Sequence, residues 1–148
     1  MLSVVLDSSV LVAAFLSRGG PNDQVLQAGG HAYHLYLAEA ILDEVRRVLL
    51  TYSRIRKKYP YDDQDVHDYI RSLRAASLTV FRKLPEVEAI PDDPKDNIIL
   101  ACAQKAQADY IVSKDRHLND LSVYQEIPIV GTEAFLDLLS SDSEAQSQ

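Results

Sequence analysis

The sequence predicts an α/β fold in which helices cover a central parallel sheet. Strand-like and helical segments alternate along the chain with short connections, as in doubly wound proteins. The first segment, residues 2–6, is apolar except for Ser3, which is typical of a strand buried on both faces of a parallel sheet. The length of 148 residues fits a single domain.

The first half of the chain continues with a buried helix over residues 10–16, a short helix over 22–28 and a strand over 33–37. The next predicted helix, 38–50, is amphipathic, with one apolar stripe. At about 100° per residue, Glu44 lies at the margin of that stripe and Asp43 lies nearly opposite its centre. We therefore expect Glu44 to face the protein and Asp43 to face solvent. The stripe consists of Ile41, Leu42, Val45, Val48 and Leu49.

The second half begins with a basic, tyrosine-bearing segment between helices. After it the pattern predicts a helix over 62–77, a strand over 78–81, an acidic loop with prolines over 85–94, an apolar helix from Asp96 to about Gln107, strands over 110–113 and 127–130, and a helix over 132–139. We expect residues 1–139 to form the domain. Residues 140–148 are polar and are expected to form a disordered tail.

Composition and charge limit the function. The net charge of −7 argues against a generally basic nucleic-acid-binding protein, yet ten of the fifteen Lys and Arg residues lie between positions 46 and 83. Within this stretch the candidate RNA contacts are Arg54, Arg56, Lys57 and Lys58, although an ordinary solvated helix face explains any one of them equally well. No segment has the length and apolar character of a membrane span or a signal peptide, so we expect a cytoplasmic protein without membrane contact.

Acidic residues stand where the predicted fold places its ligand-binding edge. Asp7 ends the first strand, Asp115 follows a later strand, and Asp96 begins a helix leading into that later strand. Each acid alone is also explained as a helix cap or turn residue. Because ligands bind at the carboxyl ends of parallel strands, we expect the three to converge, with Glu44 reaching them from its helix.

Clustered carboxylates repel one another unless a hard divalent cation neutralises them. The sequence therefore predicts an Mg²⁺ or Mn²⁺ site. The four histidines are not in ligand spacing with one another or with Cys102, so no zinc site is predicted. The cysteine lies in an apolar run and is expected to be a buried core residue.

Four motifs in order carry a resemblance to a known family. They occupy residues 5–11, 41–49, 92–97 and 108–118, and together they resemble the successive motifs of PIN-domain ribonucleases, most of all the toxins of toxin-antitoxin modules. The likeness extends from Leu2 to Leu139. It implies a three-layer αβα sandwich with a central parallel sheet, an endoribonuclease that depends on Mg²⁺ or Mn²⁺, an RNA substrate, a cognate antitoxin protein as partner, and a homodimer.

The resemblance also assigns roles to individual residues. Asp7, Glu44, Asp96 and Asp115 match the family's catalytic, metal-binding acids, while Ser9 and Ser113 match positions that hydrogen-bond within the site. Two departures stand out. The chain has Ser113-Lys114-Asp115 where the family often has Thr-Gly-Asp, and it has His117 where another Asp is frequent, which bears on a second metal ion.

Two other functions compete with this interpretation. One is a non-catalytic PIN-like module that binds RNA or protein, although such a module has no need to retain all four acids. The other is phosphoryl transfer through an aspartyl phosphate at Asp7. The residues around Asp7 lack the second acid, two positions on, that haloacid-dehalogenase-like phosphatases use. The chain also has no glycine-rich phosphate loop.

Overall fold

The computed structural model describes residues 1–90 and 93–147; Asp92, part of the third motif, lies outside them. Its strands are β1 (Leu2–Leu6), β2 (Tyr33–Ala38), β3 (Thr79–Phe81), β4 (Tyr110–Val112), β5 (Val123–Tyr124) and β6 (Ile127–Val130). They form one sheet in the order β3-β2-β1-β4-β6-β5. All neighbouring pairs are parallel except the edge pair β5–β6.

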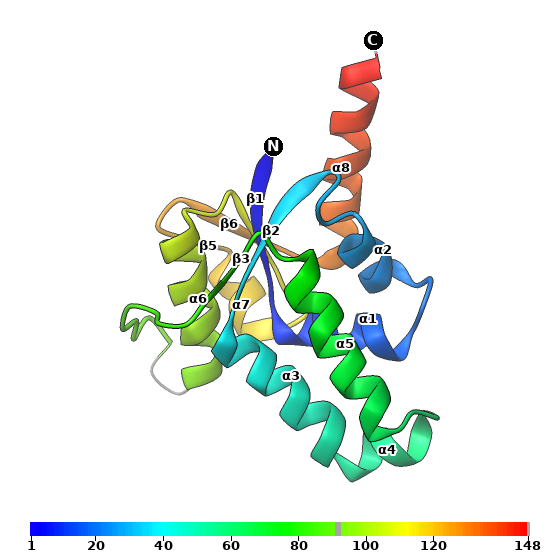
Figure 1. The fold of residues 1–148 in the computed structure, drawn as a ribbon. Coiled ribbons are helices and arrows are strands. Elements are labelled where there is room, and N and C mark those ends of the chain that lie inside the picture. Colours follow the sequence, from blue (N-terminus) through cyan, green and yellow to red (C-terminus); the bar gives the residue numbers. More distant parts are fainter. Residues whose placement is uncertain (91–92, 148) are drawn as a thin grey trace.

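The helices lie on both faces of this sheet (Figure 1). They are α1 (Ser8–Leu16), α2 (Pro21–Gln27), α3 (Glu39–Thr51), α4 (Ser53–Lys58), α5 (Asp63–Ala76), α6 (Pro94–Ala106), α7 (Arg116–Leu121) and α8 (Thr132–Ser147). Helix α1 contacts α2 and α3, α3 contacts α5, and α2 contacts α8, whereas α6 packs on β1, β2 and β4. Right-handed crossovers place α6 and α7 on the face opposite α1, α3 and α5. The fold is the expected three-layer αβα sandwich.

The core confirms the prediction for the first strand. Val4, Val5 and Leu6 are fully buried because β1 lies at the centre of the sheet between β2 and β4. Helix α6 covers one side of it with an almost continuous apolar surface that includes Leu100 and Cys102, both fully buried. The single cysteine is thus a core residue, as predicted.

Helix α3 has the predicted register. Its stripe faces inward, and Ile41, Leu42, Val45 and Leu49 are buried. The side chain of Glu44 is 18% exposed, whereas that of Asp43 is 67% exposed. The apolar stripe therefore turns Glu44 toward the protein and Asp43 toward solvent.

Several predicted boundaries are wrong. Three short elements, α4, α7 and β5, were not predicted, and β5 adds an antiparallel edge to an otherwise parallel sheet. Helix α6 begins before Asp96, because Asp93 caps it and Pro94 opens it. Helix α8 extends from Thr132 to Ser147, past the predicted helix end at residue 139. The division of the chain at residue 139 stays a prediction.

Membrane insertion has no helical candidate here. Among the helices of residues 1–90 and 93–147, none combines the length and the apolar character that crossing a bilayer requires.

Candidate functional site

The site lies where the strand order reverses. From β1 the chain proceeds outward in one direction through β2 and β3, and then returns to the opposite side of β1 with β4 and β6. Ligands of open α/β sheets bind at this switch point, beyond the carboxyl ends of the strands. Asp7 directly follows β1, and Ser113 and Asp115 follow β4. The backbone N–H of Asp7 donates to Val112 O at 2.9 Å, which joins the two strand ends.

A cavity of about 640 Å³ opens at this edge. Its walls come from the ends of β1 and β4, from α1 and α3, and from the beginning of α6. All four predicted acids line it, namely Asp7, Glu44, Asp96 and Asp115. The structure therefore brings together in one pocket residues that lie more than a hundred positions apart in sequence.

Hydroxyl groups fix Asp7 in place. Ser9 Oγ donates to Asp7 Oδ2 at 2.8 Å and Ser113 Oγ donates to the same oxygen at 2.7 Å. The hydroxyls in turn accept from the next loop, since Lys114 N–H donates to Ser9 Oγ at 3.0 Å and Asp115 N–H donates to Ser113 Oγ at 2.9 Å. Burial raises the pKa of Asp7, and the two hydroxyl donors oppose that shift.

Asp96 lies in a very different environment. It is only 4% exposed, and within the described residues its Oδ2 atom has no hydrogen-bond partner. Burial, followed by the negative charges of Asp115 and Asp93, raises the pKa of Asp96 to about 8. Such a buried, unsatisfied carboxylate oxygen is costly unless a proton or a cation neutralises it.

Glu44 is paired with cations. Arg47 Nη2 lies 2.8 Å from Glu44 Oε1, and Lys95 Nζ lies 3.1 Å from the same oxygen. Partial burial alone would raise the pKa of Glu44, but the hydrogen bonds from Arg47 and Lys95 outweigh it and lower the pKa. Glu44 therefore enters the pocket as a carboxylate that already has partners.

Comparison with known proteins identifies the fold family. A PIN-domain family model matches residues 3–117, which include all four acids of the pocket. The chain belongs to the PIN-domain family. No curated protein matches this sequence.

PIN domains are in general metal-dependent nucleases, and the pocket of this PIN domain has a donor set that suits a divalent ion. Carboxylate oxygens are the preferred ligands of Mg²⁺ and Mn²⁺. The negative charge of Asp115 adds to burial in raising the pKa of both Asp7 and Asp96, and Asp96 offers a buried oxygen with no hydrogen-bond partner among the described residues. The residues therefore fit the kind of ion that the family uses.

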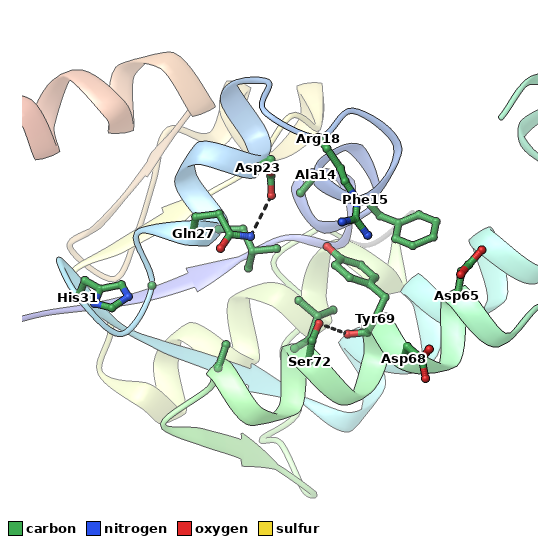
Figure 2. A pocket seen from close by; sticks show the side chains of 14 residues that line it. Ala14, Phe15, Arg18, Asp23, Gln27, His31, Asp65, Asp68, Tyr69 and Ser72 are labelled. Atoms are coloured by element: carbon green, nitrogen blue, oxygen red, sulfur yellow. Dashed lines mark hydrogen bonds between the residues drawn. The ribbon is translucent and has the colours of Figure 1, made fainter. Parts of the chain in front are cut away.

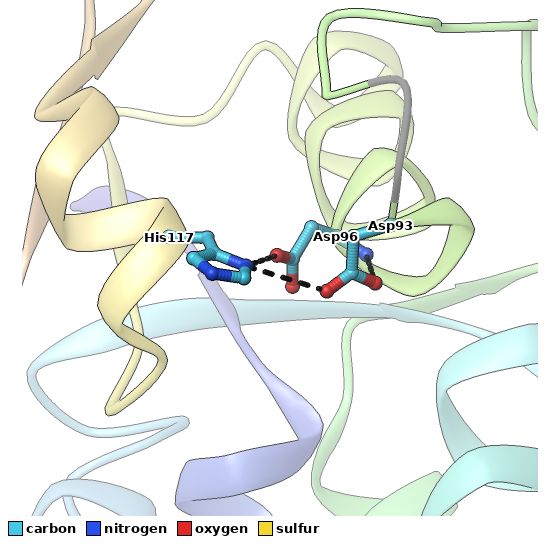
Figure 3. A group of neighbouring side chains, drawn as sticks. All are labelled: Asp93, Asp96 and His117. Atoms are coloured by element: carbon cyan, nitrogen blue, oxygen red, sulfur yellow. Dashed lines mark hydrogen bonds and ion pairs between the residues drawn. The ribbon is translucent and has the colours of Figure 1, made fainter.

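Two further residues, Asp93 and His117, lie beside the four acids but were not predicted as site residues, although His117 was noted as a departure from the family pattern. Asp93 Oδ2 lies 3.7 Å from His117 Nδ1, and Asp96 Oδ2 lies 3.9 Å from the same nitrogen (Figure 3). The sequence analysis excluded a zinc site made of His and Cys, but it did not predict that His117 lies beside the two aspartates. Spacing within the sequence could not reveal this group, because α6 and α7 meet only in the folded chain. The available signal was the position of His117, two residues after Asp115.

The basic segment of the PIN domain forms α4, beside the pocket. Its four candidate RNA contacts are absent from the described lining of the pocket, which in this region includes Tyr59. Arg56 Nη1 pairs with Asp63 at 2.7 Å and is partly covered. Arg54, Lys57 and Lys58 are exposed.

A second cavity, of about 530 Å³, lies elsewhere on the PIN domain, between α1, α2 and α5 (Figure 2). Phe15, Arg18 and Tyr69 are among its lining residues, and the Tyr69 hydroxyl donates to Leu11 O at 2.6 Å. The described lining includes none of the four predicted acids. The acid-lined pocket is therefore the candidate active site.

Proposed function

We propose that this PIN domain is a divalent-metal-dependent endoribonuclease that uses Mg²⁺ or Mn²⁺ to hydrolyse phosphodiester bonds. One observation carries the proposal. Two buried carboxylates, Asp7 and Asp96, lie with Asp115 in one pocket at the topological switch point, and the oxygen Asp96 Oδ2 has no hydrogen-bond partner among the described residues.

In this proposal Asp7, Asp96 and Asp115 hold the metal, and Glu44 completes the acidic wall. A bound divalent ion supplies a Lewis acid that polarises the phosphodiester and makes water a better nucleophile at neutral pH. Ser9 and Ser113 occupy Asp7 Oδ2, and so they fix the orientation of the carboxylate and keep its charge in the pocket. Nothing in this arrangement requires a covalent nucleophile from the chain.

The cations of the pocket support an anionic substrate. Lys95 and Lys114 line the pocket together with the acids. Lys95 pairs with Glu44 at the pocket wall, and the phosphate of a bound substrate can compete with Glu44 for its ammonium group. The exposed cations of α4 extend this basic surface away from the pocket, and we propose that Arg54, Arg56, Lys57 and Lys58 contact the RNA backbone.

The test is cleavage of a labelled single-stranded RNA by the purified protein, beside a DNA strand of the same sequence. We expect RNA fragments with Mg²⁺ or Mn²⁺, none with excess chelator, and no fragments from DNA. Restoring the metal after chelation should restore cleavage. Binding of RNA without fragments under every metal condition would instead indicate the non-catalytic binding module and overturn the proposal.

We also propose that the protein is the toxin of a toxin-antitoxin pair, with a cytoplasmic location and a homodimeric state as further predictions. In this proposal the antitoxin inserts an Arg or Lys side chain into the acidic pocket and competes there with the metal ion. Arginine suits this role, because its planar guanidinium bonds carboxylates in a bidentate manner and stays charged when buried. The contact of Lys95 with Glu44 supports the idea that a cationic side chain fits there.

The partner is tested with the product of the neighbouring reading frame, if that product is a small DNA-binding protein. It should co-purify with this chain and inhibit cleavage, and raised Mg²⁺ should weaken the inhibition. Inhibition that persists after every Arg and Lys of the contacting segment is replaced would refute occlusion of the pocket by a cation.

A further inference from the structure

His117, Asp93 and Asp96 form a group with the composition of a metal site. One ligand atom from each residue, an imidazole nitrogen and two carboxylate oxygens, lies within 4.8 Å of the other two. The carboxylates come from the start of α6 and the imidazole from α7, and Figure 3 shows them pointing toward one another. An acidic cluster alone would not indicate a ligand, so the state of its atoms decides what the group can do.

The carboxylate of Asp96 gives the second, independent observation. It is 4% exposed, and its Oδ2, which has no hydrogen-bond partner among the described residues, is the atom that faces His117 Nδ1 at 3.9 Å. Both separations from His117 Nδ1, 3.7 and 3.9 Å, are too long for hydrogen bonds. For an octahedral ion with ligands about 2.1 Å away, adjacent ligand atoms are about 3 Å apart. Each of the two carboxylate oxygens, at 3.7 and 3.9 Å, therefore needs to approach the imidazole nitrogen by less than about 1 Å to share an ion with it.

The surrounding structure holds two sides of this group firmly and leaves the third adjustable. Asp93 caps α6 by accepting from Asp96 N–H at 3.3 Å, which holds the Asp93 carboxylate against the backbone of Asp96. The loop before His117 is held by Asn119, whose Nδ2 donates to Ser113 O at 2.8 Å and to Asp115 O at 2.9 Å. The imidazole itself is 67% exposed, so it can turn to complete the site.

We propose that His117, Asp93 and Asp96 bind a divalent transition-metal ion, such as Mn²⁺, in preference to Mg²⁺. An imidazole nitrogen is a good ligand for transition ions, whereas Mg²⁺ favours oxygen ligands and gives up its water reluctantly. The inference rests on the proposed function only in placing this ion beside the catalytic pocket, with Asp96 at the border between the two.

The test measures bound Mn²⁺ directly, by the loss of the free-ion signal in electron paramagnetic resonance, in a large excess of Mg²⁺. The wild-type protein should retain one Mn²⁺ per chain. His117→Ala and Asp93→Asn should each raise the Kd for this ion about tenfold or more. His117→Asp should still bind a cation but should lose the preference for Mn²⁺ over Mg²⁺. His31→Ala, at an exposed histidine remote from the group, is the matched control and should change nothing.

The outcomes separate this inference from the proposed nuclease function. Retention of Mn²⁺ by His117→Ala at the wild-type affinity would overturn the inference, and so would a wild-type protein from which Mg²⁺ removes all Mn²⁺. Asp7→Asn should lose RNA cleavage yet keep the His117-dependent ion. A protein that binds Mn²⁺ through His117 but never cleaves RNA would refute the nuclease proposal and leave the metal site standing. Circular dichroism of each variant confirms that it folds.

Discussion

The two buried aspartates of the pocket have the same exposure, 4%, but opposite surroundings. Asp7 has one oxygen saturated by Ser9 and Ser113, whereas Asp96 has an oxygen without a hydrogen-bond partner in the described structure and further carboxylates nearby. At the Asp7 end of the pocket, the hydroxyls of Ser9 and Ser113 satisfy the carboxylate by hydrogen bonds. At the Asp96 end, the carboxylate charge has no compensating partner among the described residues and is neutralised only by a proton or a cation. Burial alone thus does not identify the open position of a metal site; the partners of each oxygen do.

The largest effect is expected at Asp7. Asp7→Asn is nearly isosteric but removes a charge from the proposed cation site, so cleavage of RNA should fall by about a hundredfold or more. The metal-free variant should be at least as stable as the wild type in urea, because repulsion among the acids is relieved. Undiminished cleavage by the folded variant would remove Asp7 from the site.

A neighbouring pair on α3 gives the next test. Glu44→Gln should reduce cleavage severely, and Asp43→Asn should leave it nearly unchanged, because Glu44 lines the pocket and Asp43 is an exposed partner of Arg46. Rates measured side by side at saturating metal decide the matter. Equal losses in the two variants would mean that Glu44 acts only through its surface charge.

Because the carboxylate of Asp96 has no compensating partner among the described residues, we expect the stability of the metal-free protein to depend unusually on pH. The pKa of Asp96 rises from an ordinary value of 3.8 to about 8, so between these pH values the folded chain keeps a proton that the unfolded chain has lost. The free energy of unfolding should therefore fall as pH rises from about 4 to about 8 and then level off.

Asp96→Asn carries no titrating proton and should lack this fall. Urea denaturation of both proteins in chelator across that pH range makes the comparison. A wild type and an Asp96→Asn variant with parallel pH profiles would show that Asp96 is an ordinary ionised carboxylate.

The part of the site that lies on strong periodic elements could be predicted from the sequence. The buried strand β1 places Asp7, and the apolar stripe of α3 places Glu44; both patterns are strictly local. The group of Asp93 and His117 could not be predicted, because it depends on where α6 begins and on α7, a six-residue helix with little periodicity.

We also expect substitutions at the Asp7 end and at the Asp96 end of the pocket to change the free energy of unfolding by different amounts. Ser113→Ala removes a buried hydroxyl that donates to Asp7 and accepts from Asp115 N–H, so it should cost about 1–3 kcal/mol of unfolding free energy. His117→Ala removes an exposed ring that makes no hydrogen bond with the described part of the chain, so it should change the free energy of unfolding by less than about 0.5 kcal/mol in chelator. If His117→Ala lowers the free energy of unfolding in urea more than Ser113→Ala does, the view that the Asp7 end is rigid and that His117 is free to move is wrong.

The smallest effects are expected at α4, outside the pocket. If its cations contact phosphates, replacing each of Arg54, Lys57 and Lys58 by Gln should weaken RNA binding without sequence preference. Each lost contact should also reduce the slope of log binding constant against log salt concentration by about 0.7 on single strands.

Arg56 provides an internal control, because it already pairs with Asp63 at 2.7 Å and lies over the Tyr61 ring. Arg56→Gln should therefore change the slope less than substitution of the exposed cations does. Binding is measured on catalytically silent Asp7→Asn protein by fluorescence anisotropy at several salt concentrations. If the slope stays constant when Arg54, Lys57 and Lys58 are all replaced by Gln, RNA does not contact α4. The cations of α4 would then face solvent or bind a protein partner.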